Sequence, residues 1–180
     1  RTMSLAELSR IIGSVFQNPR TQFFTLDSTS EIAFGCENIG IEREEMFRRI
    51  GRTAYELHIE NLLDKNLFSM SGGEKQKIAM ARALVKDASV FLLDEFNSGL
   101  DNYSIKLIED IVTAQKGKLV IFITHRLNPE TLKKCDEILF MQDGKIAEHG
   151  NFSALLENNN SLFKNFYEND AEKINNPPHE

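Results

Sequence analysis

Two acidic residues, Asp94 and Glu95, directly follow the apolar run Val90–Leu93. A run of this kind predicts a strand buried in a parallel sheet, and α/β folds bind their ligands at the edge where such strands end. Asp94 could hold a hydrated Mg²⁺ at that edge, and Glu95 could polarise a water molecule for attack on a phosphorus atom. Two like charges side by side are costly unless they share a cation or a proton, and an isolated acidic pair can also simply begin a solvated loop.

A second candidate site lies at the start of a predicted helix, in the stretch Ser71-Gly72-Gly73-Glu74. Serine followed three residues later by glutamate predicts a capping box, in which each side chain satisfies a backbone N–H of the other residue. The box does not explain the glycines, since each lowers helix stability by up to about 1 kcal/mol relative to alanine. Without side chains they leave N–H groups accessible at the positive end of the helix dipole, where a phosphate can bind. A plain helix cap and an anion site are both compatible with this stretch.

Two further polar residues follow apolar runs that predict strands. His125 comes after Leu119–Thr124, and its imidazole could donate a hydrogen bond to a terminal phosphate. Gln17 comes after Ile11–Phe16, and Asn18-Pro19 then predicts a turn that would place the Gln17 amide at the same edge of the sheet. Each is weak evidence by itself, since a histidine or glutamine after a strand is commonly an ordinary loop residue.

Strands and helices alternate in the pattern of an α/β fold. Four short apolar runs rich in β-branched and aromatic residues predict strands. The second and third are continuous rather than alternating, which predicts burial on both faces of a parallel sheet, and a helical pattern between them completes a βαβ unit. The predicted strands are Ile11–Phe16, Val90–Leu93, Leu119–Thr124 and Ile138–Met141, and the connecting helix is Asn102–Gln115.

More than 70 residues separate the first predicted strand from the second, too many for a simple crossover. Helical patterns at Glu42–Leu57 and Glu74–Val85 predict an inserted helical lobe in this interval. Farther along, Asp143-Gly144 predicts a hairpin turn between two short strands, and Ser153–Tyr167 predicts a helix before a frayed end.

The composition is that of an ordinary globular domain, 41% hydrophobic and 27% charged over 180 residues. A net charge of −6, with acids and bases interspersed, gives no broad basic surface and argues against a nucleic-acid partner. The two cysteines, Cys36 and Cys135, have no metal-ligand spacing and fit a reducing compartment. No apolar run is long enough to cross a bilayer, and the start of the chain lacks the pattern of a signal peptide.

The order of these candidate sites along the chain resembles that of the ATP-binding domain of ABC (ATP-binding cassette) proteins, over roughly residues 11–150. The resemblance implies an α/β fold: part of a P-loop NTPase (RecA-like) parallel sheet with an inserted α-helical subdomain. By this resemblance, Gln17 is the Q-loop glutamine, a catalytic group and Mg²⁺ ligand, and the signature motif that contacts ATP contains Ser71, Gly72, Gly73 and Glu74. Asp94 is the Walker B metal ligand, and Glu95 is the catalytic glutamate. Asp101 is the D-loop residue at the ATP site, and His125 is the catalytic switch histidine.

The resemblance also implies cofactors, partners and a location. Domains of this family use ATP and Mg²⁺, work in pairs with a second ABC ATPase domain as homo- or heterodimers, and drive a transmembrane permease from the cytoplasmic face of the cell membrane. The implied segments are 1–26 with the Q-loop strand and the start of the core, 27–86 as the helical signature subdomain, 87–150 as the C-terminal part of the catalytic core, and 151–180 as a C-terminal helix and frayed tail.

In the family, the helical lobe and the Q-loop receive the permease. Five apolar residues recur at helical spacing in this lobe and are expected to lie in its core, whereas three phenylalanines are better candidates for exposure. The expected core residues are Met46, Phe47, Ile50, Ala54 and Leu57, and the expected exposed ones are Phe23, Phe24 and Phe34.

The sequence departs from the family in one large respect, because the phosphate-binding pattern G-x-x-x-x-G-K-[ST] does not occur in it. A truncated fragment explains this more simply than a true loss, and the chain alone is expected to hydrolyse ATP poorly or not at all. The alternative function is a non-catalytic interaction module that offers its signature surface and helical lobe to a partner. A soluble ABC ATPase of the DNA-repair or translation type is disfavoured, since no coiled-coil insertion or basic patch is visible.

Subfamily features are mixed. The stretch "VFQNPRTQFFTLDSTSEIAFGCENIG" resembles energy-coupling-factor importers, whereas "ITHRL" and "CDEILFMQDGKIAEHG" resemble exporter-type cassettes. The direction of transport and the substrate therefore stay open, and a mosaic origin is one explanation of the mixture.

Overall fold

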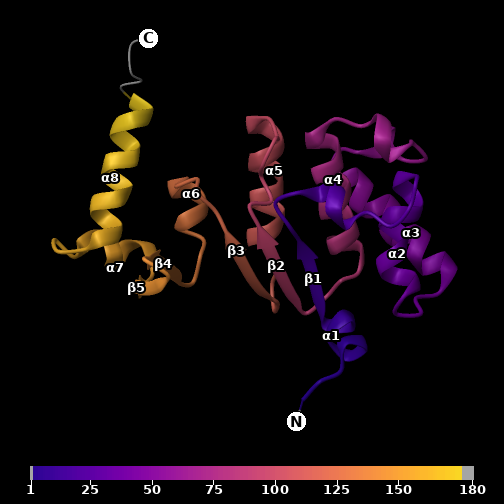
Figure 1. The fold of residues 1–180 in the computed structure, drawn as a ribbon, viewed down its shortest axis with the longest axis horizontal. Coiled ribbons are helices and arrows are strands. Elements are labelled where there is room, and N and C mark those ends of the chain that lie inside the picture. The colour runs from indigo at the N-terminus through magenta and orange to yellow at the C-terminus, as the bar shows by residue number, and fades with distance from the viewer. Residues whose placement is uncertain (1, 176–180) are drawn as a thin grey trace. The chain divides into compact units, whose positions relative to one another are not determined.

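The structure, a computed structural model, describes residues 2–175 of the chain. They fold into two compact units that divide between Thr124 and His125. Figure 1 shows a parallel sheet and a helical lobe in the first unit, and a β-hairpin with short and long helices in the second. The division falls inside the expected segment 87–150, and the four segments expected from the sequence stay a prediction.

The first unit is built on a parallel sheet with the strand order β1–β2–β3. Its register pairs Val15 with Leu93 and Asp94 with Ile123, so the strands end close to one line. Helix α5 (Asn102–Thr113) links β2 to β3 and completes the predicted βαβ unit. The strands are β1 (Ile12–Val15), β2 (Val90–Asp94) and β3 (Leu119–Ile123), which confirms the strands predicted in this part of the sequence.

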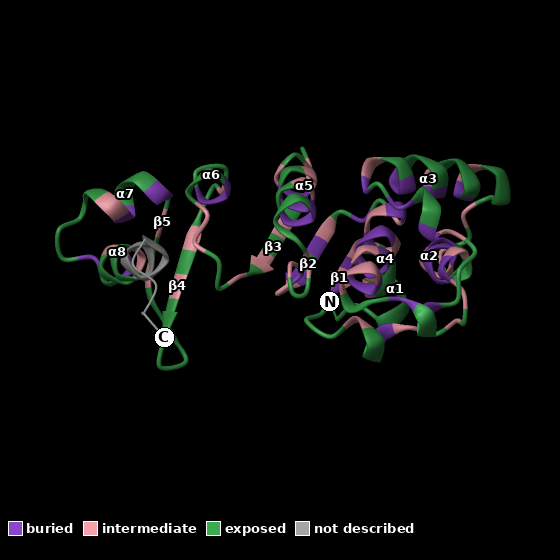
Figure 2. Ribbon diagram, turned by 90° about the horizontal axis from the view of Figure 1, so that it is seen from above, coloured by how far each residue is buried: buried purple, intermediate pink, exposed green. Residues whose placement is uncertain are grey.

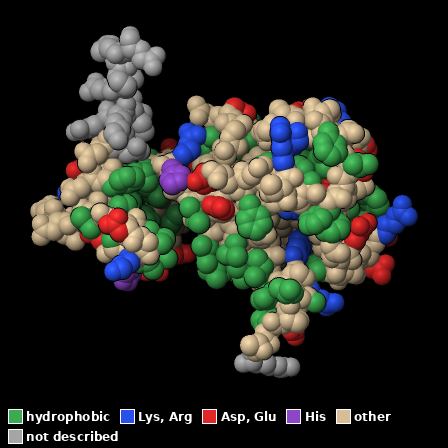
Figure 3. All heavy atoms as spheres, viewed as in Figure 1, with side chains coloured by type: hydrophobic (Ala, Val, Ile, Leu, Met, Phe, Trp, Pro, Cys, Tyr) green, Lys and Arg blue, Asp and Glu red, His purple; other side chains and the backbone are tan. Residues whose placement is uncertain are grey.

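One face of this sheet is covered by helices and the other is exposed. Phe91 and Leu93 of β2 are buried in one core cluster with Ile108 and Val112 of α5. Successive strand residues point to opposite faces, so covering one face leaves alternate residues exposed. The prediction that β2 and β3 are buried on both faces is therefore wrong within the described residues, because one face leaves four large apolar side chains exposed. Figure 3 shows hydrophobic side chains gathered over the sheet. The four exposed side chains are Leu92, Leu119, Ile121 and Ile123.

Three helices form the predicted helical lobe between β1 and β2: α2 (Ser28–Glu37), α3 (Arg43–Glu56) and α4 (Gly72–Val85). Figure 2 shows buried residues concentrated on the sides where these helices face one another. Four of the five expected core residues, Met46, Ile50, Ala54 and Leu57, are buried. The fifth, Phe47, is 48% exposed and lies under the guanidinium of Arg43 at 5.6 Å from the ring centroid, so its expected burial is wrong.

Helix α2 was not predicted, because its buried side is partly polar. Ser28 and Glu31 are fully buried beside Ile32 and Cys36, so the apolar residues alone do not show helical periodicity. The remaining elements of the first unit are short: α1 (Leu5–Ile11) and the 3₁₀ turns η1 (Pro19–Gln22), η2 (Glu60–Leu62) and η3 (Leu67–Ser69).

The second unit contains the predicted hairpin, β4 (Ile138–Gln142) and β5 (Lys145–Gly150), with its turn at Asp143-Gly144. Both turn residues have positive φ, 50° and 73°, as the favoured two-residue hairpin turn requires. Its helices are α6 (Pro129–Leu132), α7 (Phe152–Glu157) and α8 (Leu162–Asn175). Its core consists of Leu132, Phe152, Leu155 and Phe163, and the predicted frayed end at 176–180 lies outside the described residues.

The single helix predicted at Ser153–Tyr167 is two helices, because Glu148 on β5 fixes the start of α8. Its carboxylate accepts hydrogen bonds from Ser161 Oγ (2.7 Å) and from the backbone N–H groups of Leu162 (2.9 Å) and Phe163 (3.0 Å). These bonds lower the pKa of Glu148, with the N–H of Phe163 as the largest cause. A carboxylate satisfies the first N–H groups of a helix and interacts favourably with its dipole, so α8 begins anew at Leu162.

The substitution Glu148→Gln should lower the Tm at neutral pH, because an amide loses the charge-assisted part of these bonds. Folding lowers the pKa of Glu148, so its stabilising effect is present above the unfolded-state pKa of about 4.3 and is lost as the pH falls through the lowered folded-state pKa. The Tm difference between wild type and variant, measured by circular dichroism from about pH 7 to about pH 3, should therefore close on acidification. Glu157→Gln on α7 is the control, and a difference that stays constant with pH contradicts the role of Glu148.

Candidate functional site

The carboxyl ends of β1 and β2 bring two predicted site residues into contact. Val15, the last residue of β1, pairs with Leu93, and Asp94 ends β2. Gln17 lies two residues beyond β1, and Glu95 lies one residue beyond β2. Gln17 Nε2 donates a hydrogen bond of 2.5 Å to Glu95 Oε2, although 78 residues separate the two along the chain. The amide and the carboxylate thus meet at one edge of the sheet.

Glu95 adopts a left-handed backbone conformation, with φ of 43°. A non-glycine residue at positive φ costs roughly 1–2 kcal/mol, and such strain persists only where the surrounding structure imposes it. Here the Glu95 N–H donates to the carbonyl of Ile123 at the end of β3 (3.1 Å), and the Glu95 carbonyl accepts from the N–H of Ser98 (3.0 Å). This turn directs the Glu95 side chain toward Gln17.

Asp94 ends β2 half-buried, directly before Glu95. The described residues hold no group of three or more His, Cys, Asp and Glu side chains that could enclose a metal ion. Mg²⁺ does not need such a group, since it commonly keeps several waters and takes other ligands from substrate phosphates. The assignment of Asp94 and Gln17 as Mg²⁺ ligands therefore stays a prediction.

Helix α4 begins with the capping box predicted at Ser71 and Glu74. The Ser71 N–H donates to Glu74 Oε2 (2.8 Å), and the Glu74 N–H donates to Ser71 Oγ (3.2 Å). The bond from the Ser71 N–H is the main cause that lowers the pKa of Glu74. An ionised carboxylate in the first turn of a helix also interacts favourably with the helix dipole. The capping interpretation of these two residues is confirmed.

The two glycines of this stretch have different surroundings. A Cβ built at Gly72 would meet nothing within 4 Å, so the backbone there is open to an approaching group. A Cβ built at Gly73 would lie only 2.7 Å from the carbonyl oxygen of Gly99 and 3.5 Å from Leu100 Cδ2. The expectation that both glycines leave bare backbone is therefore met at Gly72, whereas Gly73 is required by the close approach of the loop after Glu95.

Asp101 caps helix α5 at the end of the same loop. Its Oδ1 accepts a hydrogen bond from the Ser104 N–H (2.9 Å) and its Oδ2 accepts one from Ser104 Oγ (2.8 Å). The N–H bond is the largest cause that lowers the pKa of Asp101. The carboxylate predicted at the ATP site is thus used within the chain to fix where α5 begins.

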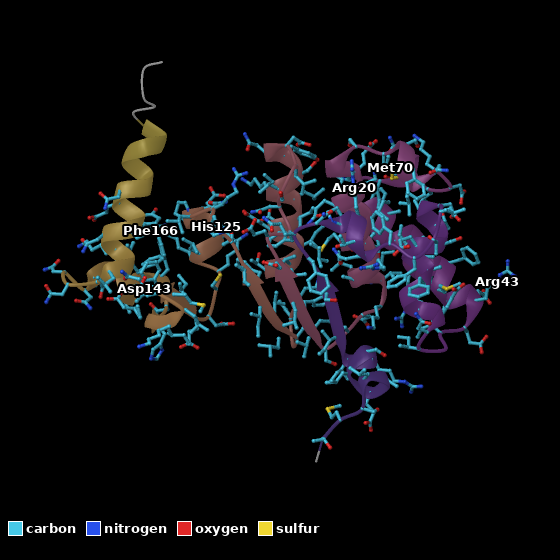
Figure 4. The ribbon with its side chains drawn as sticks, viewed as in Figure 1. Arg20, Arg43, Met70, His125, Asp143 and Phe166 are labelled. Atoms are coloured by element: carbon cyan, nitrogen blue, oxygen red, sulfur yellow. The ribbon has the colours of Figure 1, made fainter. Side chains whose placement is uncertain are left out.

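His125 follows β3 after Thr124 and is the first residue of the second unit. Figure 4 labels it at the start of the segment that leads to α6. Its predicted contact with a phosphate stays a prediction.

Three residues that the sequence analysis did not single out form a buried polar network beside the segment that carries Gln17. Arg82 on α4 donates from Nη1 to Glu31 Oε1 (2.6 Å) and from Nη2 to Gln22 Oε1 (3.0 Å). Glu31 is fully buried and Gln22 is 6% exposed. The sequence does show an arginine among the apolar residues of the predicted helix Glu74–Val85, which indicates a buried cation. It does not show which residues bond to that arginine.

Comparison with known proteins decides the family. The family model of the ABC transporter matches residues 2–98, which is more than half of the chain. The chain belongs to the ABC transporter family. The predicted resemblance to an ABC ATP-binding domain is confirmed, and so is the α/β fold of a P-loop NTPase with a parallel sheet.

Several relatives of the ABC family are similar over most of this chain. A putative ABC transporter ATP-binding protein of Treponema denticola is 43% identical over 145 residues, which are 79% of this chain and 29% of that protein. The energy-coupling factor transporter ATP-binding protein EcfA of Onion yellows phytoplasma is 39% identical over 135 residues, 75% of this chain and 49% of that protein. A solved structure of cbiO1 from Clostridium perfringens, described as part of the ABC transporter complex cbiONQ, matches with a TM-score of 0.69 at 27% identity and covers 93% of this chain and 66% of its own.

This chain therefore spans less than two thirds of the length of these ABC relatives. The match to EcfA confirms the resemblance of part of the sequence to energy-coupling-factor proteins. The exporter-like character of the stretches after Ile123 stays a prediction.

The two signature glycines of this ABC chain should respond oppositely to alanine. Gly73→Ala should lower the free energy of unfolding by roughly 1–3 kcal/mol, because the new methyl group collides with the backbone of Gly99. Gly72→Ala has open space and a better helix former, so stability should stay unchanged or rise by up to about 1 kcal/mol. Urea unfolding of the two variants is the measurement, and equal destabilisation at both positions contradicts the packing described for Gly73.

Proposed function

We propose that this ABC chain is part of an ATP-binding protein that hydrolyses ATP with Mg²⁺ and couples hydrolysis to the movement of a substrate across a membrane. The observation that carries the proposal is the hydrogen bond between Gln17 and Glu95, directly beside Asp94. Phosphoryl transfer to water requires a group that orients the attacking water and a ligand for the metal next to it. Both residue types lie at the carboxyl edge of one sheet, where the strained turn at Glu95 directs the side chain.

The proposed chemistry assigns one task to each residue. Glu95 accepts a hydrogen bond from the attacking water and takes up its proton as the water oxygen bonds to the terminal phosphorus and the bridging oxygen of ADP leaves. Gln17 restrains one carboxylate oxygen of Glu95 and is a second metal ligand beside Asp94. Bound Mg²⁺ supplies charge neutralisation on the phosphates. His125 donates a hydrogen bond to the terminal phosphate.

On the signature side, Ser71, Gly72 and Gly73 contact ATP held by a second ABC ATPase domain in this proposal. The open backbone at Gly72, at the positive end of the 14-residue helix α4, supports it. Glu74 and Asp101 act at the same surface by fixing the first turns of α4 and α5, since both are engaged in helix caps.

The phosphate-binding pattern G-x-x-x-x-G-K-[ST] does not occur in these 180 residues, and this supports a second candidate function. On its own the chain would hydrolyse ATP weakly and would serve as an interaction module through its signature surface and helical lobe. The two functions are distinguished on the complete protein, in which an upstream G-x-x-x-x-G-K-[ST] motif in the coding sequence favours the ATPase.

In the complete protein, Glu95→Gln should abolish turnover while ATP still binds. The substitution keeps the size of the side chain but removes the general base, which is typically responsible for a rate factor of about 100 or more. ATPase rate and ATP affinity are measured together, with Glu60→Gln on η2 as the matched control. Unchanged hydrolysis would remove Glu95 from the proposed role.

We further propose that an exposed apolar surface of the helical lobe docks a transmembrane permease on the cytoplasmic face of the membrane. Phe24, Leu26 and Phe68, here called the lobe surface, are 72%, 67% and 77% exposed. The backbone N–H of Leu67 donates to the carbonyl of Leu26 (2.9 Å), which brings Phe68 beside Leu26 and Phe24, and contiguous exposed apolar patches mark interaction sites. Among the phenylalanines expected at the surface, Phe24 is exposed, whereas Phe34 is half-buried in a stack with it at 4.8 Å and Phe23 is also half-buried.

A cavity of about 300 Å³ opens beside the lobe surface. It is lined by two cations, Arg20 and Lys75, and by Phe23 and Phe68, and Figure 4 shows Arg20 and Met70 at this part of the lobe. Lys75 donates to the carbonyl of Met70 at 2.5 Å. Aromatic walls with cations suit a partner helix that inserts an apolar or acidic side chain. Within residues 2–175 the chain has no helix long and apolar enough to span a membrane.

Phe24→Asp and Phe68→Asp should each weaken association with the permease about tenfold or more, because buried aromatic anchors dominate interface energies. Copurification from membranes and permease-stimulated ATPase activity are the measurements. Phe47→Asp, at a half-exposed phenylalanine on α3, is the control. Loss of basal ATPase activity with permease binding intact would argue against this surface.

A further inference from the structure

Gln22 clamps the backbone on both sides of Gln17. Its Nε2 donates to the carbonyl of Phe16 and to the carbonyl of Asn18, each at 3.2 Å. Its Oε1 accepts from Arg82 Nη2 at 3.0 Å. Only one orientation of the amide satisfies all three contacts, since carbonyls only accept hydrogen bonds and a guanidinium only donates them.

Arg82 is itself held in place by buried partners. Its Nη1 donates to the carbonyl of Gln22 (2.5 Å) and to Glu31 Oε1 (2.6 Å). The other oxygen of Glu31 accepts from the N–H groups of Phe24 (2.9 Å) and Thr25 (3.0 Å). A buried charged network with its atoms satisfied resists rearrangement, because any shift leaves a desolvated group unpaired.

This network joins three separate elements of the first unit. Arg82 lies on α4, the helix that begins at the Ser71 cap, Glu31 lies on α2, and Gln22 ends η1. The segment that carries Gln17 is therefore fastened to the helix that carries the signature residues. Beyond this clamp, the Gln17 amide meets Glu95 at 2.5 Å.

We propose that Gln22, held by Arg82 and Glu31, is a positioning residue that sets the Gln17 amide against the Glu95 carboxylate. The inference rests on the proposed ATPase function of that pair. The polar atoms of Gln22 bond to the backbone beside Gln17 and to Arg82, so Gln22 acts on the reaction through Gln17. Its loss should slow the chemical step and leave the Kd for metal-free ATP unchanged, because the proposed contact of Gln17 with the nucleotide is made only through Mg²⁺.

The variant Gln22→Glu tests this, since a carboxylate keeps the size of the side chain and the contact with Arg82 but cannot donate to the carbonyls of Phe16 and Asn18. In the complete protein assembled with its permease, kcat should fall about tenfold per ATP-binding molecule, while the Kd for ATP measured without Mg²⁺ stays within about twofold. The control is Gln115→Glu, which replaces an amide that also donates to a backbone carbonyl, that of Ile111 at 3.1 Å, and it should leave kcat unchanged.

A double-mutant cycle with Gln17→Ala separates positioning from a merely structural role. If Gln22 acts through Gln17, Gln22→Glu changes kcat by less than about twofold in the Gln17→Ala background, as measured in single-turnover assays. Three results overturn the inference. The first is a fall in kcat of less than about twofold when Gln22→Glu is made in the wild type, and the second is a fall in kcat of about twofold or more in the Gln17→Ala background. The third is a loss of affinity for metal-free ATP with kcat unchanged.

A second variant and a comparison with the catalytic variants complete the experiment. If Gln22→Glu does not fold, Gln22→Asn takes its place with the same expectations, because its amide is one methylene too short to reach both carbonyls. Failure of the proposed function gives a different result, since Glu95→Gln and Gln17→Ala would then leave hydrolysis unchanged whatever the effect at Gln22.

Discussion

The buried ion pair between Arg82 and Glu31 is the interaction around which the first unit is arranged. The side chains are 12% and 0% exposed, and their atoms are 2.6 Å apart. A buried pair adds little net stability, because desolvation offsets the attraction, yet removing one partner typically costs about 3–5 kcal/mol. Its main effect is geometric. It holds the chain from Gln22 to Thr25, which has little regular structure of its own, against two helices.

Close backbone contacts fix helix α4 at both of its ends. Near its C-terminal end, a Cβ at Gly13 of β1 would lie 3.2 Å from the carbonyl of Ala83 and 3.0 Å from the ring of Phe91, so glycine allows the helix to approach the sheet. At its N-terminal end, Gly73 meets the carbonyl of Gly99 in the loop after Glu95. Because Gly73 packs directly against the backbone of this loop, the signature residues can move relative to the loop only if α4 or the turn at Glu95 also moves.

The sequence predicted local features of this fold well and polar contacts between distant elements only in part. The strands of the first unit, α3 to α5 and the hairpin at Asp143 follow from periodicity and turn chemistry, which are local. The neighbourhood of Gln17 and Glu95 was also predictable, because parallel strands end at one edge. The role of Gln22 was not predictable, since it depends on a hydrogen bond to Arg82, 60 residues away. No local sequence pattern indicates which buried amide bonds to which guanidinium.

Other differences have equally specific causes. Helix α2 escaped prediction because its buried side contains Ser28 and Glu31, which bond to distant partners. The predicted helix at Ser153–Tyr167 broke in two because Glu148, brought back by the hairpin, supplies a new helix start. In both cases a tertiary hydrogen bond outweighed the local pattern.

The conformation of Glu95 bears on the choice between a functional carboxylate and the start of a solvated loop. Positive φ by itself does not decide this, because Asp64, Asp87 and Asp143 also adopt it in turns. Here the N–H of Glu95 is bonded to the end of β3 and its side chain is bonded to Gln17, so the strained conformation is imposed from both neighbouring strands. Gln17 is in turn held by the clamp of Gln22. A chain of long-range polar contacts thus leads from the interior of the helical lobe to one carboxylate at the sheet edge, which a simple loop does not require.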